Sequence, residues 1–261
     1  MAIALSKETE RRVNLAKESA RTVILTKGLD VQKSQVKFVL DISGSMRDLL
    51  LSGTVQKVCE RVLGLALNFD DDGEAEVYPF HNKTFRHPNA MSLANIEGFV
   101  DREIMRNYSL GSTKYAPFIN MLLEDSGFVA NEVDTGGLVN SIKGFFGKKV
   151  EADPSSIQTI DLPSYVIVIT DGDNDYEDKA PAEEAIKKAS KFGMFFQFVG
   201  IGNASFSFLE KLDNMGGRFM DNANFFQAND IDKIENKELY SRMLHEYPDW
   251  LKEAKSKQLI K

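Results

Sequence analysis

Three oxygen-bearing side chains alternate in the segment Asp41-Ile42-Ser43-Gly44-Ser45, directly after an apolar run at residues 36–40. In a tight turn after a strand, alternate positions point the same way, so Asp41, Ser43 and Ser45 would converge. Gly44 allows the backbone to make that turn. Hard divalent cations bind carboxylate and hydroxyl oxygens of this kind. The segment therefore indicates part of a cation site, although a lone aspartate after a strand could instead cap the following helix.

Two later segments bring further oxygens. Thr170-Asp171-Gly172 stands at the end of the almost wholly apolar run YVIVIT and contributes a second carboxylate. Gly111-Ser112-Thr113 precedes a predicted helix and offers a third hydroxyl. Ligands bind at the carboxyl ends of the strands in an open parallel sheet, so these segments are expected to meet there. This convergence favours metal binding, with the candidate ligands Asp41, Ser43, Ser45, Thr113 and Asp171.

The elements that must position these residues alternate between strands and helices. Apolar runs predict strands at residues 36–40, 75–80, 165–170 and 195–201, with a hairpin partner at Phe85 and a last strand at residues 218–220. Helical spacing predicts helices at residues 6–27, 54–68, 92–105, from 115, 181–192, 205–215 and 230–255, the last interrupted by Pro248. This order predicts an α/β fold with a doubly wound, Rossmann-like, mostly parallel sheet covered by helices on both faces.

The domain organisation follows from the same reading. The 261 residues fit one α/β domain with additions. We expect an N-terminal helical extension at residues 1–28, a single domain at residues 29–261 and a long insertion at residues 127–164. The insertion has little apolar periodicity, and long loops of this kind are usually functional or disordered, so we expect mobility or partner-dependent order. The N-terminal helix is expected to pack through Val13, Ala16, Ala20 and Val23.

Composition limits the partners. The net charge of −7 disfavours nucleic acid, because binding phosphates needs a positive face. The one cysteine, Cys59, lies at helical spacing among valines and leucines, which indicates a buried thiol and a reducing compartment. The chain starts without a signal-peptide pattern and lacks a membrane-spanning run, so we expect a cytoplasmic protein. The amphipathic face at residues 138–146 is interpreted first as a local helix covering the domain, second as a partner-docking helix, and last as a membrane-surface contact.

Other metal motifs are rejected. The acidic residues from Asp171 to Glu177 alternate like the start of an EF-hand, but Tyr176 stands where that loop needs glycine and Ala182 where it needs glutamate. Asp173 remains a candidate for tuning an ion indirectly. The three histidines lack zinc-ligand spacing and are expected at the surface; they are His81, His87 and His245.

The three oxygen-bearing segments closely resemble the metal-ion-dependent adhesion site (MIDAS) of von Willebrand factor A (vWA) domains. The segments DNANFF (residues 221–226) and ELYSRMLHEYPDWLKEAK (residues 238–255) resemble the C-terminal end of the TerF-like vWA domains, which are linked to bacterial tellurite resistance and stress response. The likeness extends from about Thr26 to the C-terminus, apart from the insertion. It implies that Ser43, Ser45 and Thr113 bind the ion directly, and that Asp41 and Asp171 act partly through water.

The resemblance implies a metal-dependent protein-interaction module in a bacterial tellurite-resistance, stress or phage-defence (Ter-type) assembly. The ion would be Mg²⁺ or Mn²⁺, and a protein partner would complete its coordination with an Asp or Glu carboxylate. The alternative is a metal-dependent hydrolase or phosphatase. A phosphate-handling aspartyl enzyme would need a second acid near Asp41, where Ser43 stands, and the sequence has no recognisable acid–base pair or Ser–His–acid arrangement. We therefore expect a binding protein rather than an enzyme.

Overall fold

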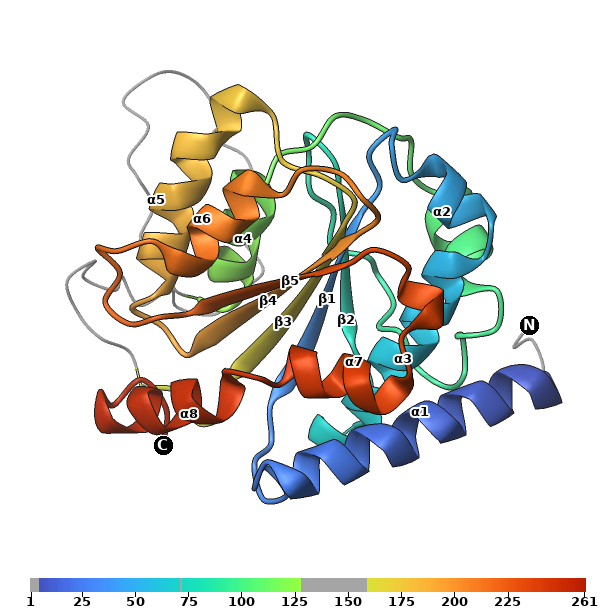
Figure 1. The fold of residues 1–261 in the computed structure, drawn as a ribbon, viewed down its shortest axis with the longest axis horizontal. Coiled ribbons are helices and arrows are strands. Elements are labelled where there is room, and N and C mark those ends of the chain that lie inside the picture. The colour runs from blue at the N-terminus through green and yellow to red at the C-terminus, as the bar shows by residue number, and fades with distance from the viewer. Residues whose placement is uncertain (1–4, 71, 128–158) are drawn as a thin grey trace, which may run out of the picture.

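A five-stranded parallel sheet forms the centre of the molecule in the computed structural model, which describes residues 5–70, 72–127 and 159–261. Its order is β2-β1-β3-β4-β5 (Figure 1). The strands are β1 (Gln35–Asp41), β2 (Glu76–Phe80), β3 (Ser164–Thr170), β4 (Met194–Ile201) and β5 (Ala223–Ala228). The predicted strands at residues 36–40, 165–170 and 195–201 are thus central and parallel, as expected.

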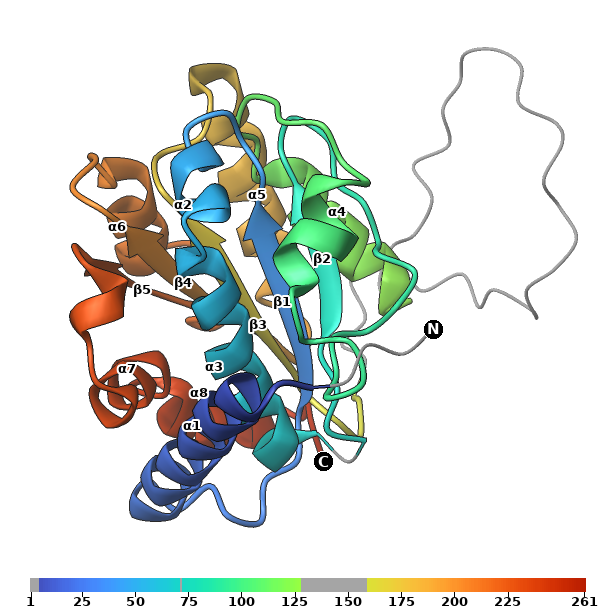
Figure 2. The same ribbon diagram turned by 90° about the vertical axis from the view of Figure 1, so that its right-hand side faces the viewer.

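Helices cover both faces of the sheet (Figures 1 and 2). Three pack on one face: α4 (Ala116–Asp125), α5 (Lys179–Ala189) and α6 (Ser207–Asn214). The other face carries α1 (Lys7–Thr26), α2 (Arg47–Leu51), α3 (Thr54–Phe69), α7 (Asn236–Met243) and α8 (Tyr247–Ser256). The predicted α/β class with added N- and C-terminal helices is confirmed. In the part of the chain that the structure describes, no helix combines the length and apolarity needed to cross a bilayer.

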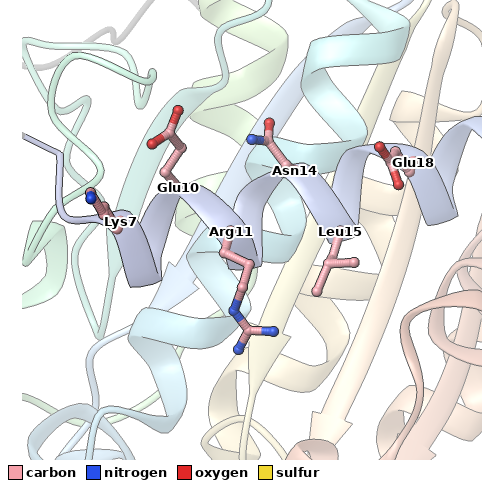
Figure 3. Close-up of a pocket in the computed structure, with 6 residues that line it drawn as sticks. All are labelled: Lys7, Glu10, Arg11, Asn14, Leu15 and Glu18. Carbon is pink, nitrogen blue, oxygen red and sulfur yellow. The ribbon is translucent and has the colours of Figure 1, made fainter.

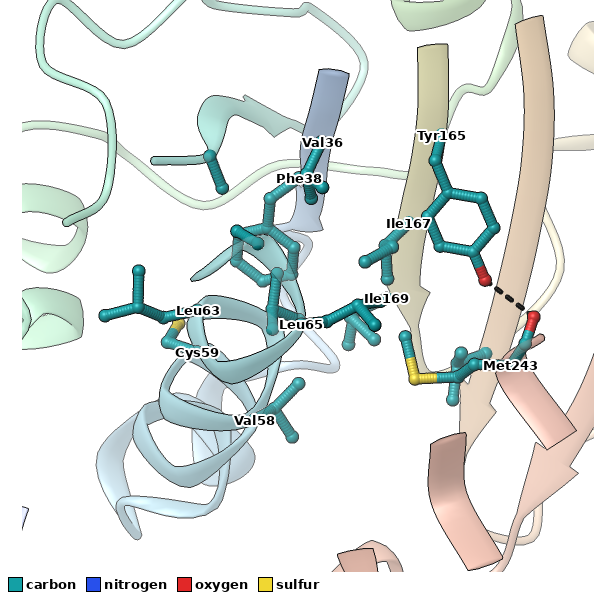
Figure 4. Close-up of a cluster of buried hydrophobic side chains, with 14 of the residues drawn as sticks. Val36, Phe38, Val58, Cys59, Leu63, Leu65, Tyr165, Ile167, Ile169 and Met243 are labelled. Carbon is teal, nitrogen blue, oxygen red and sulfur yellow. Dashed lines mark hydrogen bonds between the residues drawn. The ribbon is translucent and has the colours of Figure 1, made fainter. Parts of the chain in front are cut away.

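The central strands are apolar because both their faces are buried. On β1, Val36 and Phe38 belong to the core on the α3 side of the sheet (Figure 4). Val39, the residue after Phe38, belongs to the core on the opposite face. Such strands read as continuous apolar runs rather than alternating ones. Cys59 of α3 lies fully buried in the first of these cores, as predicted. The hydroxyl of Tyr165, also on that face, donates to the backbone oxygen of Met243 at 2.6 Å and so ties β3 to α7.

The N-terminal helix is part of the main hydrophobic core. Its predicted apolar stripe is buried against α3 and α7, which confirms the packing expected for Val13, Ala16, Ala20 and Val23. A Cβ atom added at Gly64 of α3 would lie 2.7 Å from the Cβ of Ala16, so the two helices approach more closely there than any side chain would allow. Arg12 reaches across to the buried Glu60 with hydrogen bonds of 2.6 and 2.9 Å. Helix α3 is therefore enclosed between the sheet and α1.

Two predicted elements are wrong. The helix expected at residues 92–105 is replaced by turns and a short π-helix at Val100–Met105. Asn95 accepts a hydrogen bond from the backbone of Ser92 and donates one to Ala90, and such local side-chain bonds compete with helix formation. The strand expected at residues 218–220 begins instead at Ala223, because Arg218 donates to backbone oxygens at the end of α6 and holds its segment there.

Two histidines are also misplaced by the sequence prediction. His81 and His87 are buried rather than at the surface, whereas His245 is exposed. His87 shares a 2.8 Å hydrogen bond with the hydroxyl of Tyr108, and His81 accepts one from the backbone of Lys83. Both lie in the segment that covers the outer edge of β2, where the predicted hairpin partner at residue 85 is confirmed.

The structure describes the predicted insertion only at its ends. Ile160 pairs with Ile260 near the C-terminus, and Ser164 already belongs to β3. Residues 128–158, with the amphipathic face expected at residues 138–146, lie outside the described residues.

Candidate metal centre

The candidate ligands come from loops that leave the carboxyl edge of the sheet. Asp41 is the last residue of β1 and lies beside Phe80, the last residue of β2. The turn after β1 is held from the β2 side, because the amide of Ile42 donates to the oxygen of Phe80 at 2.7 Å. The backbone of Ser43 then pairs with Gly111, and the amide of Gly44 donates to the oxygen of Gly111 at 2.8 Å. The turn that follows β1 and the loop that precedes α4 are therefore joined by hydrogen bonds between their backbones.

Four of the five predicted ligands form one chain of hydrogen bonds. Asp41 accepts from the amide of Ser43 at 2.7 Å, and the hydroxyls of Ser43 and Ser45 share a bond of 3.0 Å. The Ser45 hydroxyl donates to Asp171 at 2.7 Å. The second oxygen of Asp41 accepts from the hydroxyl of Thr170, at 2.6 Å. The residues that sequence reasoning placed at one edge thus lie within hydrogen-bonding reach, and Thr170 is a partner whose role it did not assign.

Thr113 lies beside this group without joining it. Its loop is fixed by the pairing of Gly111 with Ser43, two residues earlier. A Cβ atom at Gly111 would lie 2.8 Å from the ring of His81, so only glycine allows the loop to approach β2 so closely. The backbone oxygen of Thr113 accepts from the amide of Asp175 at 2.8 Å, and its side chain is partly exposed. Among the described residues, its hydroxyl takes no part in the hydrogen bonds that join the other four candidates.

Among the described residues, hydrogen bonds rather than nearby cations oppose the effect of burial on the pKa of the two carboxyl groups. Burial raises the pKa of the fully buried Asp41 to about 7, although hydrogen bonds from Thr170 and Ser43 oppose the rise. Burial also raises the pKa of Asp171, opposed by the Ser45 hydroxyl. The opposing groups are hydroxyls and amides, which lower a carboxyl pKa less than a nearby cation does. A divalent cation bound here would stabilise the ionised form of both carboxyl groups, which burial otherwise disfavours.

The donor chemistry fits a hard cation. Carboxylate and hydroxyl oxygens are the ligands that Mg²⁺ and Mn²⁺ take, whereas zinc sites use cysteine and histidine. Within the described ranges, no group of three or more His, Cys, Asp or Glu side chains is placed to hold a metal. A metal bound here would therefore depend on the serine and threonine hydroxyls as well as on Asp41 and Asp171.

The acidic residues after Asp171 are occupied by other donors, in agreement with the rejection of an EF-hand loop. Asp173 accepts from the amide of Phe208 at 3.1 Å and caps the start of α6, and its indirect effect on an ion stays a prediction. Asp175 accepts from the hydroxyl of Ser112 at 2.8 Å. Asp178 accepts from backbone amides at the start of α4. These acidic residues therefore attach the loop that follows β3 to the neighbouring segments at the start of α4 and α6.

The sheet order and the helices on both faces define the class of the molecule as a vWA fold. The sequence model of the vWA domain found in the TerF C terminus matches residues 33–260. The chain therefore belongs to the TerF-like family of vWA domains. It is 36% identical over 252 residues to the uncharacterized protein YcbR of Bacillus subtilis (strain 168), covering 95% of this chain and 90% of that protein.

Solved structures of other proteins are similar to parts of this chain. The TFIIH p34 N-terminal domain is 15% identical, with a TM-score of 0.48, over 82% of this chain and 98% of that chain. Manganese-loaded TRAP protein of Plasmodium vivax is 15% identical, with a TM-score of 0.45, over 76% of this chain and 70% of that chain. Proximal thread matrix protein 1 from the mussel byssus, with a zinc-occupied MIDAS motif, is 14% identical, with a TM-score of 0.45, and this chain spans about half of it, 52%.

A hollow on the surface of α1 lies away from this edge (Figure 3). All its lining residues belong to the exposed side of that single helix: Lys7, Glu10, Arg11, Asn14, Leu15 and Glu18. One helix face gives no enclosure, and ligand sites are usually concave and enclosed on several sides. The edge of the sheet is therefore the stronger candidate for function.

Proposed function

We propose that this chain is a metal-dependent protein-interaction module with a MIDAS-type site for Mg²⁺ or Mn²⁺. The observation that carries the proposal is the hydrogen-bonded group of Asp41, Ser43, Ser45 and Asp171 at the carboxyl edge of the sheet. Thr113, on the adjoining loop, would complete the protein ligands.

The exposure of these residues indicates the side from which a partner approaches. Asp41 and Ser43 are buried beneath the site, whereas Ser45 and the neighbouring Ser112 are exposed. Asp171 lies between these extremes. When bound, the cation supplies a positive charge at this open side, which would attract an Asp or Glu carboxylate of a protein partner. Contacts around the rim would then choose among partners, because specificity is a difference between affinities.

The structure favours binding over the alternative of a hydrolase or phosphatase. Both carboxylate oxygens of Asp41 accept hydrogen bonds, one from Ser43 and one from Thr170, and the group is fully buried. A nucleophile or general base must reach its substrate, which this carboxylate does not. His81, the histidine next to the site, uses its Nδ1 atom to accept from Lys83.

Family membership supports the biological setting that we propose. A TerF-like domain fits a bacterial tellurite-resistance, stress or phage-defence assembly of the Ter type. We propose that the module works there in the cytoplasm, where its single buried thiol would remain reduced.

The first test measures the metal. We expect wild-type protein to bind one Mn²⁺ in calorimetry, and Asp41→Ala to bind it at least 100-fold more weakly, since a charged ligand and its hydrogen bonds are lost. Asp101→Ala is the matched control, because this exposed aspartate pairs with Arg106 and takes no part in the hydrogen bonds that join the candidate ligands. Identical Mn²⁺ binding by wild type and Asp41→Ala would refute the site.

The second test measures the partner. Immobilised wild-type protein should retain a protein from bacterial extract, lose it in chelator and regain it with Mg²⁺. Asp41→Ala should not regain it. A partner retained equally by both proteins, with and without chelator, would show that recognition does not use this edge.

A further inference from the structure

Two loops that bear candidate ligands are joined to each other. Residues 111–116 carry Thr113 and residues 171–178 carry Asp171. The amide of Asp175 donates to the oxygen of Thr113 at 2.8 Å, and the hydroxyl of Tyr115 donates to the oxygen of Gly172 at 2.5 Å. Two side-chain contacts add to these: Ser112 with Asp175 at 2.8 Å, and Lys114 with Glu177 at 3.3 Å. Every residue from 112 to 115 therefore contacts the second loop.

Asp178 lies at the centre of this attachment. Its side chain is buried, and one carboxylate oxygen accepts from the amide of Tyr115 at 2.5 Å, the amide of Ala116 at 3.3 Å and the side chain of Asn174 at 2.7 Å. Tyr115 and Ala116 begin α4, whose first amides have no partner within the helix. The helix supplies no side-chain cap of its own. A residue more than 60 positions away in sequence therefore caps α4 and fixes where the Thr113 loop enters it.

We propose that Asp178 is a positioning residue that sets Thr113 in register with Asp171 by holding the two loops together. The coupling of the loops stands on the contacts above, and only its consequence for metal affinity rests on the proposed function. Asp178 also directly precedes α5, which packs beside α4 on the same face of the sheet (Figure 1). The Thr113 and Asp171 loops are thus attached to one helical layer and would move together.

The coupling is tested without metal by amide hydrogen exchange. In Asp178→Ala we expect faster exchange at Tyr115 and Ala116, which lose their acceptor, and also at Asp175, which does not contact the removed carboxylate through its amide. The matched control is Ser6→Ala, which removes the N-cap of α1 instead. Unchanged exchange at Asp175 in Asp178→Ala would overturn the proposal. If Asp178→Ala does not fold, Asp178→Leu, which also lacks an acceptor but fills the side-chain volume, takes its place with the same expected and refuting results.

The consequence for the metal is tested by Mn²⁺ calorimetry. Loss of groups that orient metal ligands weakens affinity by roughly 10- to 100-fold, and we expect about tenfold for Asp178→Ala and no change for Ser6→Ala. In a Thr113→Val background, which lacks the positioned hydroxyl, Asp178→Ala should weaken binding little further. Full, additive losses in the double variant would overturn positioning through Thr113. Wild-type protein that binds no Mn²⁺ would instead refute the proposed function, and the exchange result would still decide whether Asp178 couples the loops.

Discussion

Replacing Asp41 with Asn separates the charge of the candidate site from its shape. The Asn oxygen can still accept from the amide of Ser43, and its nitrogen can donate to the hydroxyl of Thr170, so both contacts have a counterpart. In metal-free wild type, burial raises the pKa of Asp41 from 3.8 to about 7. The folded state therefore holds this proton more tightly than the unfolded chain. The resulting stability is complete below about pH 4 and is lost as the pH rises through about 7.

The size of the effect follows from that pKa rise. Between pH 4 and pH 8 the wild type should lose up to about 4 kcal/mol through Asp41, whereas Asp41→Asn loses none through this position. In chelator at pH 8 we expect the variant to be more stable by about 2–4 kcal/mol, on the order of 5–15 °C in Tm, and nearly equal to wild type at pH 4. Mn²⁺ at about 1,000 times its Kd should reverse the order, because a ligand at that concentration stabilises the folded protein that binds it by about 4.1 kcal/mol.

Circular dichroism melts at pH 4 and pH 8, each with chelator and with Mn²⁺, measure these differences. The reasoning about a costly buried carboxylate is refuted if Asp41→Asn in chelator is less stable than wild type at pH 8. A stability difference that does not depend on pH would equally exclude ionisation of Asp41 as the cause.

Three further changes test the packing and electrostatics elsewhere. Gly64→Ala should destabilise by about 1–3 kcal/mol in urea unfolding despite better helix propensity, and adding Ala16→Gly should recover part of the loss. Tyr165→Phe should cost about 1–2 kcal/mol, because the buried oxygen of Met243 loses its donor; an unchanged urea midpoint would contradict this. Burial and two nearby aspartates raise the pKa of the partly exposed Glu246 to about 7, so the wild type loses stability as the pH rises through that value. Glu246→Gln should reduce this loss of stability by less than about 1 kcal/mol, measured in melts at pH 5 and pH 8.

The parts of the site that sequence predicted are those fixed by local pattern. Asp41, Ser43 and Ser45 follow a buried strand, and the parallel arrangement of β1 and β3 brings Asp171 to the same edge. Strand direction and side-chain alternation are local properties, so the residues could be grouped before their distances were known. Thr113 could be placed on the right loop but not at a given distance, because that depends on how the loop packs.

The features that sequence did not predict depend on contacts between distant segments. Asp178 caps a helix more than 60 residues earlier, and no spacing within residues 171–178 indicates that contact. His87 is buried because Tyr108 and Phe99 pack around its ring, which only the path of residues 81–108 decides. The absence of the helix predicted at residues 92–105 had a local signal in the sequence. Asn95 can form hydrogen bonds with nearby backbone groups, and such bonds compete with helix formation.

The enclosure of α3 between the sheet and α1 affects the thermodynamics of ligand binding at the other end of the molecule. Ser43 and Ser45 precede α2 and α3, and α3 cannot slide or rotate without opening one interface with β1 and another with α1. The conformational entropy of this side of the site is therefore lost during folding rather than on binding, and such preorganisation favours affinity. Any movement that accompanies a change of ligand would then be confined to the opposite side, where the Thr113 and Asp171 loops are attached to α4 and α5.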